Sequence, residues 1–278
     1  MYQIIDGKKI SQEIKDELKD KVAALKEQEK TVCLAVIQVG SDPASSVYVG
    51  NKKKACAYIG IESLSYELPE ETTEQELLEL VQKLNADDKV NGILVQLPLP
   101  KQINEENVIQ TIAPEKDVDG FHEKNVGALC VGSKGYVSCT PLGIIQLLKR
   151  SGIEIAGKHC VVIGRSNIVG KPMAMLLLRE NGTVTVCHSR TQNLKEITRQ
   201  ADILVVAVGK PKFVDDSYIK EGAVVIDVGI HRNENNKLCG DVDYEKVAPH
   251  TSAITPVPGG VGPMTIAMLM YNCVSSVE

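Results

Sequence analysis

The sequence predicts an α/β protein with two domains and parallel sheets. Short apolar runs rich in Val and Ile alternate with longer segments of helical periodicity along most of the 278 residues. Alternation of this kind is typical of parallel sheets that helices cover on both faces. A glycine-bearing turn, from Gly164 to Gly170, lies near the middle of the chain. Its position indicates that a second α/β domain follows a separate first one.

The elements of the first domain follow from its apolar runs and helical patterns. The third strand ends before Pro98, because proline cannot extend a sheet ladder. The second helix has a capping hydroxyl at Ser45 or Ser46. We expect strands at 32–39, 64–68 and 90–97, and helices at 10–27, 46–59, 74–84 and 105–112.

The second domain repeats this alternation. We expect a helix at 142–150, strands at 159–163, 183–187, 203–208 and 224–228, and a last apolar helix at 264–274. The predicted domains are residues 1–139, with the helix at 264–278 packing back onto them, and residues 140–263. No linker rich in Pro, Gly or Ser separates the two. We therefore expect helices to join the domains and a ligand to bind in a cleft between them.

Composition excludes several classes of protein. A net charge of −5 argues against general nucleic-acid binding, which needs a basic surface. No apolar stretch approaches the length of a membrane span, and the N-terminus does not resemble a secretory signal. The eight cysteines are scattered without a C-x-x-C pair, so we expect a cytoplasmic protein with no zinc site. With two Phe and no Trp, the core is expected to be aliphatic.

The segment V-V-I-G-R-S-N-I-V-G-K-P at 161–172 predicts a strand, a tight turn and a helix with proline in its first turn. Such a turn points backbone N–H groups and a helix dipole at an anion, as in the Rossmann unit that binds a dinucleotide pyrophosphate. The pattern is G-x-S-x-x-x-G rather than G-x-G-x-x-G, so an ordinary strand-to-helix turn is the alternative.

The end of the next strand indicates which dinucleotide would bind. His188-Ser189-Arg190-Thr191 follows the strand at 183–187 and contains no carboxylate. A carboxylate there would repel a 2′-phosphate, whereas a hydroxyl and a guanidinium can bind one. Arg165 in the glycine turn offers a second positive charge. The sequence therefore favours NADP over NAD, with Arg190 as a solvated surface residue the alternative.

Tyr48 and Lys52 form the first candidate for catalysis. Four residues apart on the helix at 46–59, they share a face with Ala55, Cys56 and Ile59, while Lys53 and Lys54 turn away. A lysine held against an apolar face loses hydration, which favours its neutral form and allows general acid or base catalysis. Alternatively, its stem packs and its ammonium group reaches water.

Two further loops carry polar groups. Gln96 lies at the carboxyl end of an apolar strand, where ligands of α/β proteins bind, although it could equally bond its own turn. Asp117 and Asp119 lie in P-E-K-D-V-D-G at 114–120, without the other ligands of a calcium loop. A carboxylate there suits a flat ring with adjacent N–H donors, and a turn or capping aspartate is the alternative.

The loop T-P-V-P-G-G-V-G-P at 255–263 is rigid and allows close backbone approach, with a cis peptide possible. Ligand contact is the favoured interpretation.

Taken together, these segments resemble the bifunctional methylenetetrahydrofolate dehydrogenase/methenyltetrahydrofolate cyclohydrolase family, nearly from end to end. The resemblance rests on five motifs in order: Y-x-x-x-K at 48–52, Q-L-P-L-P at 96–100, P-E-K-D-V-D-G at 114–120, G-R-S through G-K-P at 164–172, and T-P-V-P-G-G-V-G-P at 255–263. Within this family, the departure from G-x-G-x-x-G is the usual pattern.

The resemblance implies a function and a site. The enzyme would oxidise 5,10-methylenetetrahydrofolate with NADP and hydrolyse the product to 10-formyltetrahydrofolate, as a homodimer built through the cofactor domains. Lys52 would be the key cyclohydrolase residue, with Gln96 modulating it, Tyr48 contacting the folate and Asp119 binding the pterin. The implied cofactor contacts are Gly164, Arg165, Ser166, Ser189, Arg190 and Ile230, the last through its backbone. Pro258, Gly259 and Gly262 complete the expected substrate contacts.

Two other interpretations compete. An NADP-dependent dehydrogenase of a small hydroxy acid such as shikimate can also pair a lysine with an aspartate. It would leave Gln96 and the 255–263 loop without a role. A folate- or nucleotide-binding module without activity is the second alternative, and the presence of both Lys52 and Asp119 argues against it.

Overall fold

The computed structural model describes residues 2–277, apart from the side chain of Ala44. The chain forms two compact units, each assembled from separate segments. The six-stranded unit comprises Met1–Ser11 and Thr140–Thr265, and the three-stranded unit comprises Gln12–Cys139 and Ile266–Glu278. The first eleven residues thus belong with the later part of the chain, whereas the sequence-based division placed them in the first domain.

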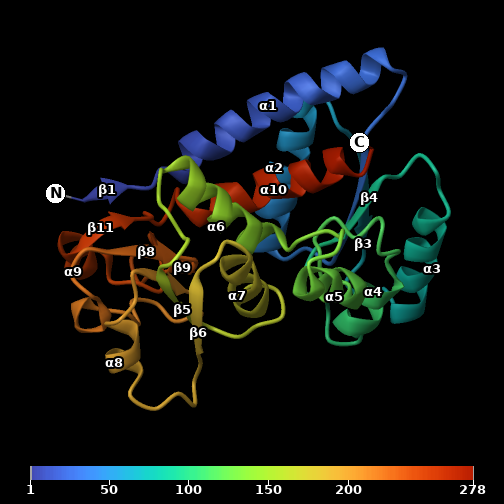
Figure 1. The fold of residues 1–278 in the computed structure, drawn as a ribbon. Helices are drawn as coiled ribbons and strands as arrows, with labels where there is room; N and C mark the ends of the chain where they lie inside the picture. The colour runs from blue at the N-terminus through green and yellow to red at the C-terminus, as the bar shows by residue number, and fades with distance from the viewer. Residues whose placement is uncertain (1, 278) are drawn as a thin grey trace. The chain divides into compact units, whose positions relative to one another are not determined.

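The six-stranded unit is built on a wholly parallel sheet with the order β1-β11-β8-β7-β5-β6. Figure 1 shows the short strands β1 and β11 together at one end of this sheet. The central strands β7 and β8 are buried along their whole length and, apart from Asp227 at the end of β8, apolar, as expected when both faces of a sheet are covered. The strands are β1 (Gln3–Ile4), β5 (His159–Ile163), β6 (Thr183–Cys187), β7 (Ile203–Val206), β8 (Ala223–Asp227) and β11 (Thr251–Ile254).

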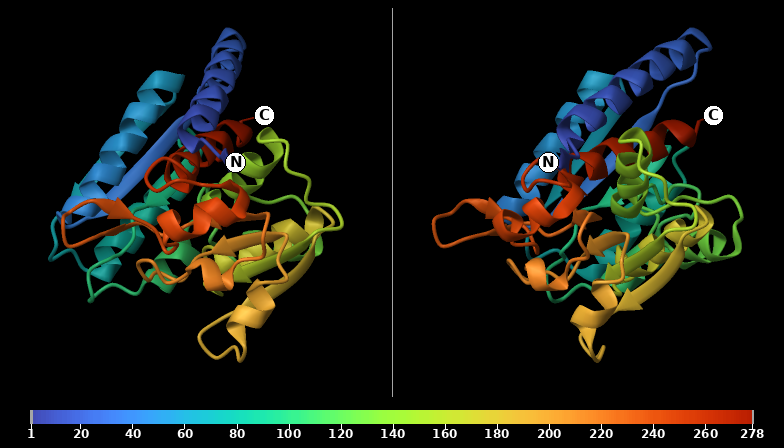
Figure 2. Two further views of the ribbon diagram at one scale, coloured as in Figure 1. Left: turned by 90° about the vertical axis from the view of Figure 1, so that its left-hand side faces the viewer. Right: turned by 60° about the vertical axis from the view of Figure 1, so that its left-hand side comes forward.

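Helices and a hairpin complete this unit. The helices are α6 (Cys139–Arg150), α7 (Gly170–Arg179), α8 (Leu194–Thr198) and α9 (Tyr244–Val247), with 3-10 turns η1 (Asp216–Tyr218) and η2 (Ala248–His250). An antiparallel hairpin of β9 (His231–Arg232) and β10 (Leu238–Cys239) extends away from the rest of the unit (orange in Figure 2). Its base lies at the carboxyl end of β8, where the predicted cofactor contact Ile230 is found.

The three-stranded unit contains a parallel sheet with β2 in the centre, in the order β3-β2-β4. All seven residues of β2 are buried, and α3 supplies Leu77, Val81 and Leu84 to the core on one face. The elements are β2 (Cys33–Val39), β3 (Glu62–Leu68), β4 (Gly92–Val95), α1 (Gly7–Glu27), α2 (Pro43–Ile59), α3 (Glu74–Asn85), α4 (Glu105–Thr111), α5 (Glu123–Val131) and α10 (Val261–Ser275). Helices α1 and α10 each run through a boundary between the units.

The predicted α/β class and parallel sheets are confirmed. Strands β5 and β6 have the predicted bounds, and the other predicted elements differ by a few residues at their ends. Cys33, Cys160 and Cys187 are buried, and the core is aliphatic as expected. Among residues 2–277, no helix is long and apolar enough to cross a membrane. The same residues hold no cluster of three or more His, Cys, Asp or Glu side chains suited to a metal ion.

Candidate functional site

Helix α2 is fixed at both ends, which orients its lysine face. Asp42 caps the first turn by accepting a hydrogen bond from Ser45 N at 2.7 Å, and Gly60 ends the helix in the left-handed conformation. The buried Gln38 at the end of β2 donates to Ser46 Oγ at 2.9 Å and ties the helix to the sheet. The rotation of α2 about its axis is therefore set by the sheet beneath it.

On this helix, Lys52 contacts the predicted partner. Its Nζ donates to Gln96 Oε1 at 2.9 Å, and Gln96 Nε2 donates to the carbonyl of Leu97 at 2.6 Å. The second bond fixes which end of the Gln96 amide faces the lysine. Lys53 instead pairs with Glu67 at 2.8 Å, as the helical rotation predicts. Tyr48 lies one turn before Lys52 with 38 % of its surface exposed, which leaves its ring accessible to a ligand.

Asp119 is the charged partner of this group. Burial raises the pKa of Asp119 to about 6, although the positive charge of Lys52 opposes that rise. The influence of Lys52 places the two side chains within electrostatic reach of each other. Lys52, which bonds Gln96, thus also influences the charge of Asp119, although the three residues lie far apart in sequence.

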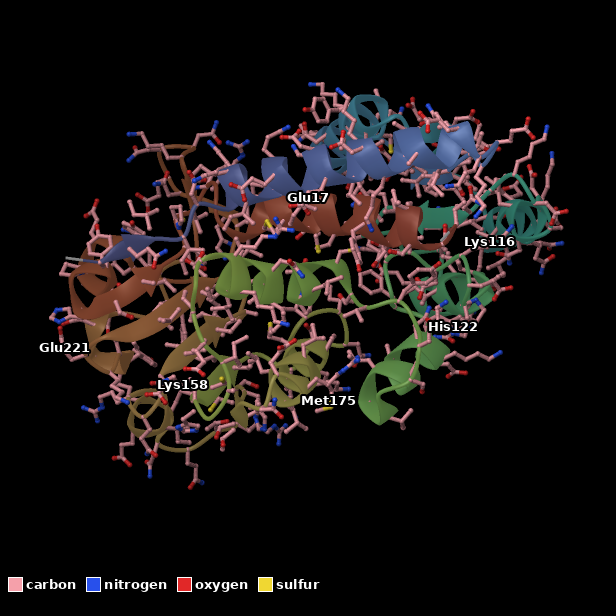
Figure 3. All side chains as sticks on the ribbon, turned by 45° about the horizontal axis from the view of Figure 1, so that its top comes forward. Glu17, Lys116, His122, Lys158, Met175 and Glu221 are labelled. Carbon is pink, nitrogen blue, oxygen red and sulfur yellow. The ribbon has the colours of Figure 1, made fainter. Side chains whose placement is uncertain are left out.

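The segment that carries Asp119 is anchored by residues whose roles the sequence did not reveal. Lys116 Nζ donates to the carbonyls of Leu84, Asn85 and Asp87 at 2.8–3.1 Å, where α3 ends. Asp117 is buried and accepts bonds from His122 N and Asn125 Nδ2 at 2.8 and 2.9 Å. Figure 3 labels Lys116 and His122, which flank this segment. Of the three charged residues at 116–119, the first two thus serve the fold.

A residue of the last helix completes the anchoring. Asn272 Nδ2 on α10 donates to the carbonyls of Val118 and Val137 at 2.8 and 3.0 Å. Val118 directly precedes Asp119, and Gly120 follows with φ +71° and no room for a Cβ beside Val137. Asn272 carried no motif in the sequence. Asn272 is 154 residues from Val118 in the sequence, so their contact could be found only from the fold.

The glycine turn after β5 contains two positions that have no room for a Cβ. Gly164 has φ +135°, and a Cβ there would overlap the carbonyl of Ala207. The amides of Val169 and Gly170 donate to Ser166 Oγ at 3.2 and 3.3 Å, so this hydroxyl holds the start of α7. Gly170 packs directly on Gly164. Arg165 is exposed at the top of the turn.

The candidate 2′-phosphate contacts follow the neighbouring strand β6. Ser189 and Arg190 are both exposed, and the loop is held by His188 N donating to Thr191 Oγ1 at 2.8 Å. Because β6 pairs with β5, this loop and the glycine turn lie at the same edge of the sheet. The structure thus brings Gly164, Arg165, Ser166, Ser189 and Arg190 to one end of two adjacent strands.

The remaining predicted contacts lie in two loops of the same unit. Ile230 follows β8 and is 44 % exposed, and its side chain lies 3.3 Å from the position that a Cβ on Gly262 would take. Pro258 follows a cis peptide bond, as the sequence allowed, and Gly259 has φ +106°. The amide of Lys8 donates to the carbonyl of Gly259 at 3.0 Å. The 255–263 loop is therefore held by the beginning of α1.

Two buried aspartates near these loops were not predicted from the sequence. Asp227 ends β8, and Asp241 follows β10. Burial raises the pKa of Asp227 to about 7, with the amides of Val242, Asp241 and Gly229 opposing. In the sequence, the only feature that distinguishes these aspartates is a nearby glycine, in D-V-G at 227–229 and in G-D at 240–241.

Comparison with known proteins places these observations in a family. The model of the tetrahydrofolate dehydrogenase/cyclohydrolase catalytic domain matches residues 5–119. That of the tetrahydrofolate dehydrogenase/cyclohydrolase NAD(P)-binding domain matches residues 138–278. The bifunctional protein FolD of Lachnoclostridium phytofermentans is 73 % identical over 99 % of this chain and 97 % of its own. That of Agathobacter rectalis is 68 % identical over the full length of both chains.

Solved structures give the same result. The crystal structure of the bifunctional enzyme FolD from Campylobacter jejuni has a TM-score of 0.98 and 52 % identity, over 100 % of this chain and 99 % of that one. The Trypanosoma brucei enzyme, solved with NADP and an inhibitor, has a TM-score of 0.94 and 39 % identity over 99 % and 97 % of the two chains. Shikimate 5-dehydrogenase from Thermus thermophilus, at 16 % identity and a TM-score of 0.53, shares only the fold. The chain belongs to the tetrahydrofolate dehydrogenase/cyclohydrolase family.

Proposed function

We propose that Lys52, Gln96, Asp119 and Tyr48 carry out the folate chemistry of this enzyme and that the loops after β5, β6 and β8 hold its cofactor. The chain is a bifunctional methylenetetrahydrofolate dehydrogenase and methenyltetrahydrofolate cyclohydrolase of one-carbon metabolism, and NADP is its cofactor. The observation that carries the assignment of residues is the 2.9 Å hydrogen bond between Lys52 Nζ and Gln96 Oε1, together with the influence of the Lys52 charge on the partly buried Asp119.

The residues of the six-stranded unit fit NADP. The glycine turn after β5 leads into the start of α7, whose N-terminal end can receive a pyrophosphate, and the exposed Ser189, Arg190 and Arg165 can bind a 2′-phosphate. When bound, NADP accepts hydride from the one-carbon bridge of 5,10-methylenetetrahydrofolate, which leaves the methenyl cation. The folate nitrogens stabilise that cation, so the contribution of the protein is to hold the folate in the reactive geometry.

The second step needs proton transfer at Lys52. In its neutral form, Lys52 removes a proton from the water that attacks the methenyl carbon. It then delivers that proton to N5 of the folate as the bond from that nitrogen to the carbon breaks. The hydroxyl proton of the adduct passes to solvent as the carbonyl forms, which yields 10-formyltetrahydrofolate. Gln96 Oε1 accepts a hydrogen from Nζ and thereby orients the lone pair of the amine toward the water.

Asp119 and the remaining contacts bind the substrate. A carboxylate can accept paired hydrogen bonds from adjacent N–H donors of a flat ring such as the pterin. The exposed ring of Tyr48, one helical turn from Lys52, can pack on the folate. Pro258, Gly259 and Gly262 stay proposed substrate contacts, supported by the rigidity of their loop.

We also propose a cytoplasmic homodimer that associates through the six-stranded unit. In support, the outer strand β6 exposes Val186 over 39 % of its surface, and the cysteines of the described residues are free thiols. Sedimentation at enzyme concentrations used in assays would test the dimer, and a purely monomeric boundary would refute it.

One time course of absorbance tests the proposed function. Purified protein is mixed with 5,10-methylenetetrahydrofolate and either NADP or NAD. We expect NADPH to form without lasting methenyl absorbance, and NAD to be much the poorer oxidant. A persistent methenyl band would refute the roles given to Lys52 and Gln96. If no NADPH formed, the assignment of the cofactor loops would fail.

A further inference from the structure

The two aspartates that sequence reasoning missed form a connected group, which we call the carboxylate pair (Asp227 and Asp241). Both side chains are almost fully buried. Asp227 Oδ1 accepts the amide of Asp241 at 2.9 Å, so the pair is joined directly. Neither residue belongs to the predicted site, yet both lie at the carboxyl end of the six-stranded sheet, where ligands of such sheets bind.

Asp241 uses both oxygens to hold the loop that follows β7. Its Oδ2 accepts the amides of Val208 and Gly209 at 2.7 and 3.0 Å. Its Oδ1 accepts the amide of Lys210 at 2.8 Å and His231 Nε2 at 2.7 Å. Three successive backbone amides therefore converge on one carboxylate, and the residue after Ile230 is tied to the same group.

Asp227 holds the loop that follows β8 and connects it to a third loop. Its oxygens accept the amides of Gly229 at 2.9 Å and Val242 at 3.0 Å. Its own amide donates to Thr255 Oγ1 at 2.8 Å, at the start of the 255–263 loop. A Cβ on Gly229 would lie 2.5 Å from Asp241 Oδ1, and one on Gly240 would overlap Asp227. The two glycines are what allow the carboxylates to approach the backbone.

These loops lie where the nicotinamide end of a dinucleotide would be. The strand order is β8-β7-β5-β6, with the glycine turn after β5 and the 2′-phosphate contacts after β6. A dinucleotide whose pyrophosphate lies on the β5 turn and whose adenosine lies toward β6 extends its other half toward β7 and β8. That half would rest on residues 207–210 and 228–230, the backbone that the carboxylate pair holds.

We propose that Asp241, supported by Asp227 and His231, is a positioning residue for the nicotinamide half of NADP, because it fixes the 207–210 and 228–230 loops on which that half lies. The inference rests on the proposed NADP site. A carboxylate suits this role because its two oxygens accept all four hydrogen bonds. An amide in its place has one accepting oxygen and presents an NH₂ group to the amide of Lys210.

The variant Asp241→Asn tests this role against general damage to the unit. We expect the Kd of NADP to rise about tenfold or more, which corresponds to roughly 1.4 kcal/mol and is typical of losing hydrogen bonds to a charged group. NAD binding should weaken by the same factor, so the NADP/NAD preference is retained. Binding of 2′,5′-ADP, which lacks the nicotinamide half, should be unchanged, as should hydrolysis of methenyltetrahydrofolate supplied directly.

Asp243→Asn is the matched control. Asp243 lies two residues further along the same segment, and its side chain pairs with Lys212 at 3.5 Å and Lys246 at 3.3 Å. Loss of those partly exposed pairs should leave NADP binding at the wild-type value. If Asp241→Asn does not fold, His231→Ala decides, because it removes a single donor to Asp241 Oδ1. We expect it to weaken NADP about threefold and to leave 2′,5′-ADP unaffected.

Two results would overturn the inference. Unchanged NADP binding in Asp241→Asn would show that the pair does not position the cofactor, and equal weakening of NADP and 2′,5′-ADP would reveal a merely structural role. Failure of the proposed function looks different. In that case the wild-type protein itself would not bind NADP.

Discussion

A single amine on α2 is expected to separate the two activities of this enzyme. Lys52 is the residue whose Nζ faces Gln96, whereas Lys53 is engaged by Glu67. The variant Lys52→Met keeps the length of the side chain and removes proton transfer. We expect hydrolysis of methenyltetrahydrofolate to fall by about 10²–10⁴, the usual contribution of a general acid or base, while some hydride transfer persists. The stopped-flow decay of the methenyl band measures hydrolysis, and the formation of NADPH measures hydride transfer.

Lys54→Met is a suitable control, since Lys54 is exposed on the same helix. Its hydrolysis should equal that of the wild type. Undiminished hydrolysis in Lys52→Met would contradict the role of this residue.

Asp119 illustrates a conflict between binding and stability. Burial holds its pKa at about 6 in the folded protein against 3.8 as the reference, so the folded state binds the proton more tightly than the unfolded one. The cost of ionising this carboxyl is therefore absent below about pH 4, grows between pH 4 and 6, and is fully present above pH 6. Asp119→Asn should raise the unfolding free energy by about 1–2 kcal/mol at pH 8, a value reduced for partial exposure, and by almost nothing at pH 4.

Denaturant titrations of both proteins at the two pH values measure this difference. The same variant should bind folate weakly, because one acceptor is lost. A variant less stable than the wild type at pH 8 would show that the carboxylate is favourably held, contrary to this account.

At the scale of elements, the loop after β6 is expected to set the choice of cofactor. Ser189 and Arg190 lie exposed beside the glycine turn, and the loop bond between His188 and Thr191 does not involve their side chains. Ser189→Asp with Arg190→Ala places a negative charge where a 2′-phosphate would bind. We expect kcat/KM with NADP to fall about 10²-fold or more and that with NAD to change little. An unchanged NADP/NAD ratio would place the phosphate site elsewhere.

The individual strands differ in how well they could be predicted from the sequence. Strand β5 was predictable as a largely apolar run, and β6 as an alternation of the β-branched residues Thr and Val. The two-residue strand β1 was missed, because its strand character comes only from pairing with β11 at the far end of the chain. The short β11, T-S-A-I, has no strong pattern of its own.

Some residues of the candidate site could likewise be predicted from the sequence, and others could not. Lys52 could be found from its spacing to Tyr48, since a helix fixes which residues share a face. Spacing alone could not separate Asp117 from Asp119, because the difference is that Asn125 and the amide of His122 engage only the first. Asp241 and Asn272 escaped notice because their partners lie in other loops and strands. Such roles depend on contacts between distant segments.

At the scale of the whole molecule, the C-terminal segment is expected to be necessary for cyclohydrolase activity. The three-stranded unit includes residues 266–278, and Asn272 there holds the carbonyls of Val118 and Val137. A chain ending at Thr265 retains Lys52, Gln96 and Asp119 but loses this support and a buried face of α10. We expect it to lose more than about 90 % of its cyclohydrolase activity, since each buried carbonyl left without a partner costs about 1–3 kcal/mol.

Asn272→Ala in the full-length chain is a smaller change than the truncation. It should lower stability without removing α10. Circular dichroism and the direct hydrolysis assay measure both effects. Wild-type hydrolysis by the shortened chain would show that the Asp119 segment holds its position unaided.

The ammonium group of Lys116 has a further consequence for chemical labelling. All three of its hydrogens are donated to carbonyls at the end of α3, and the side chain is partly buried, so these bonds must break before the amine can react. Reagents that acylate amines should modify Lys116 more slowly than the exposed lysines around it. Its protection, followed by mass spectrometry, would report whether the segment carrying Asp119 is folded under any condition of interest, independently of substrate or cofactor.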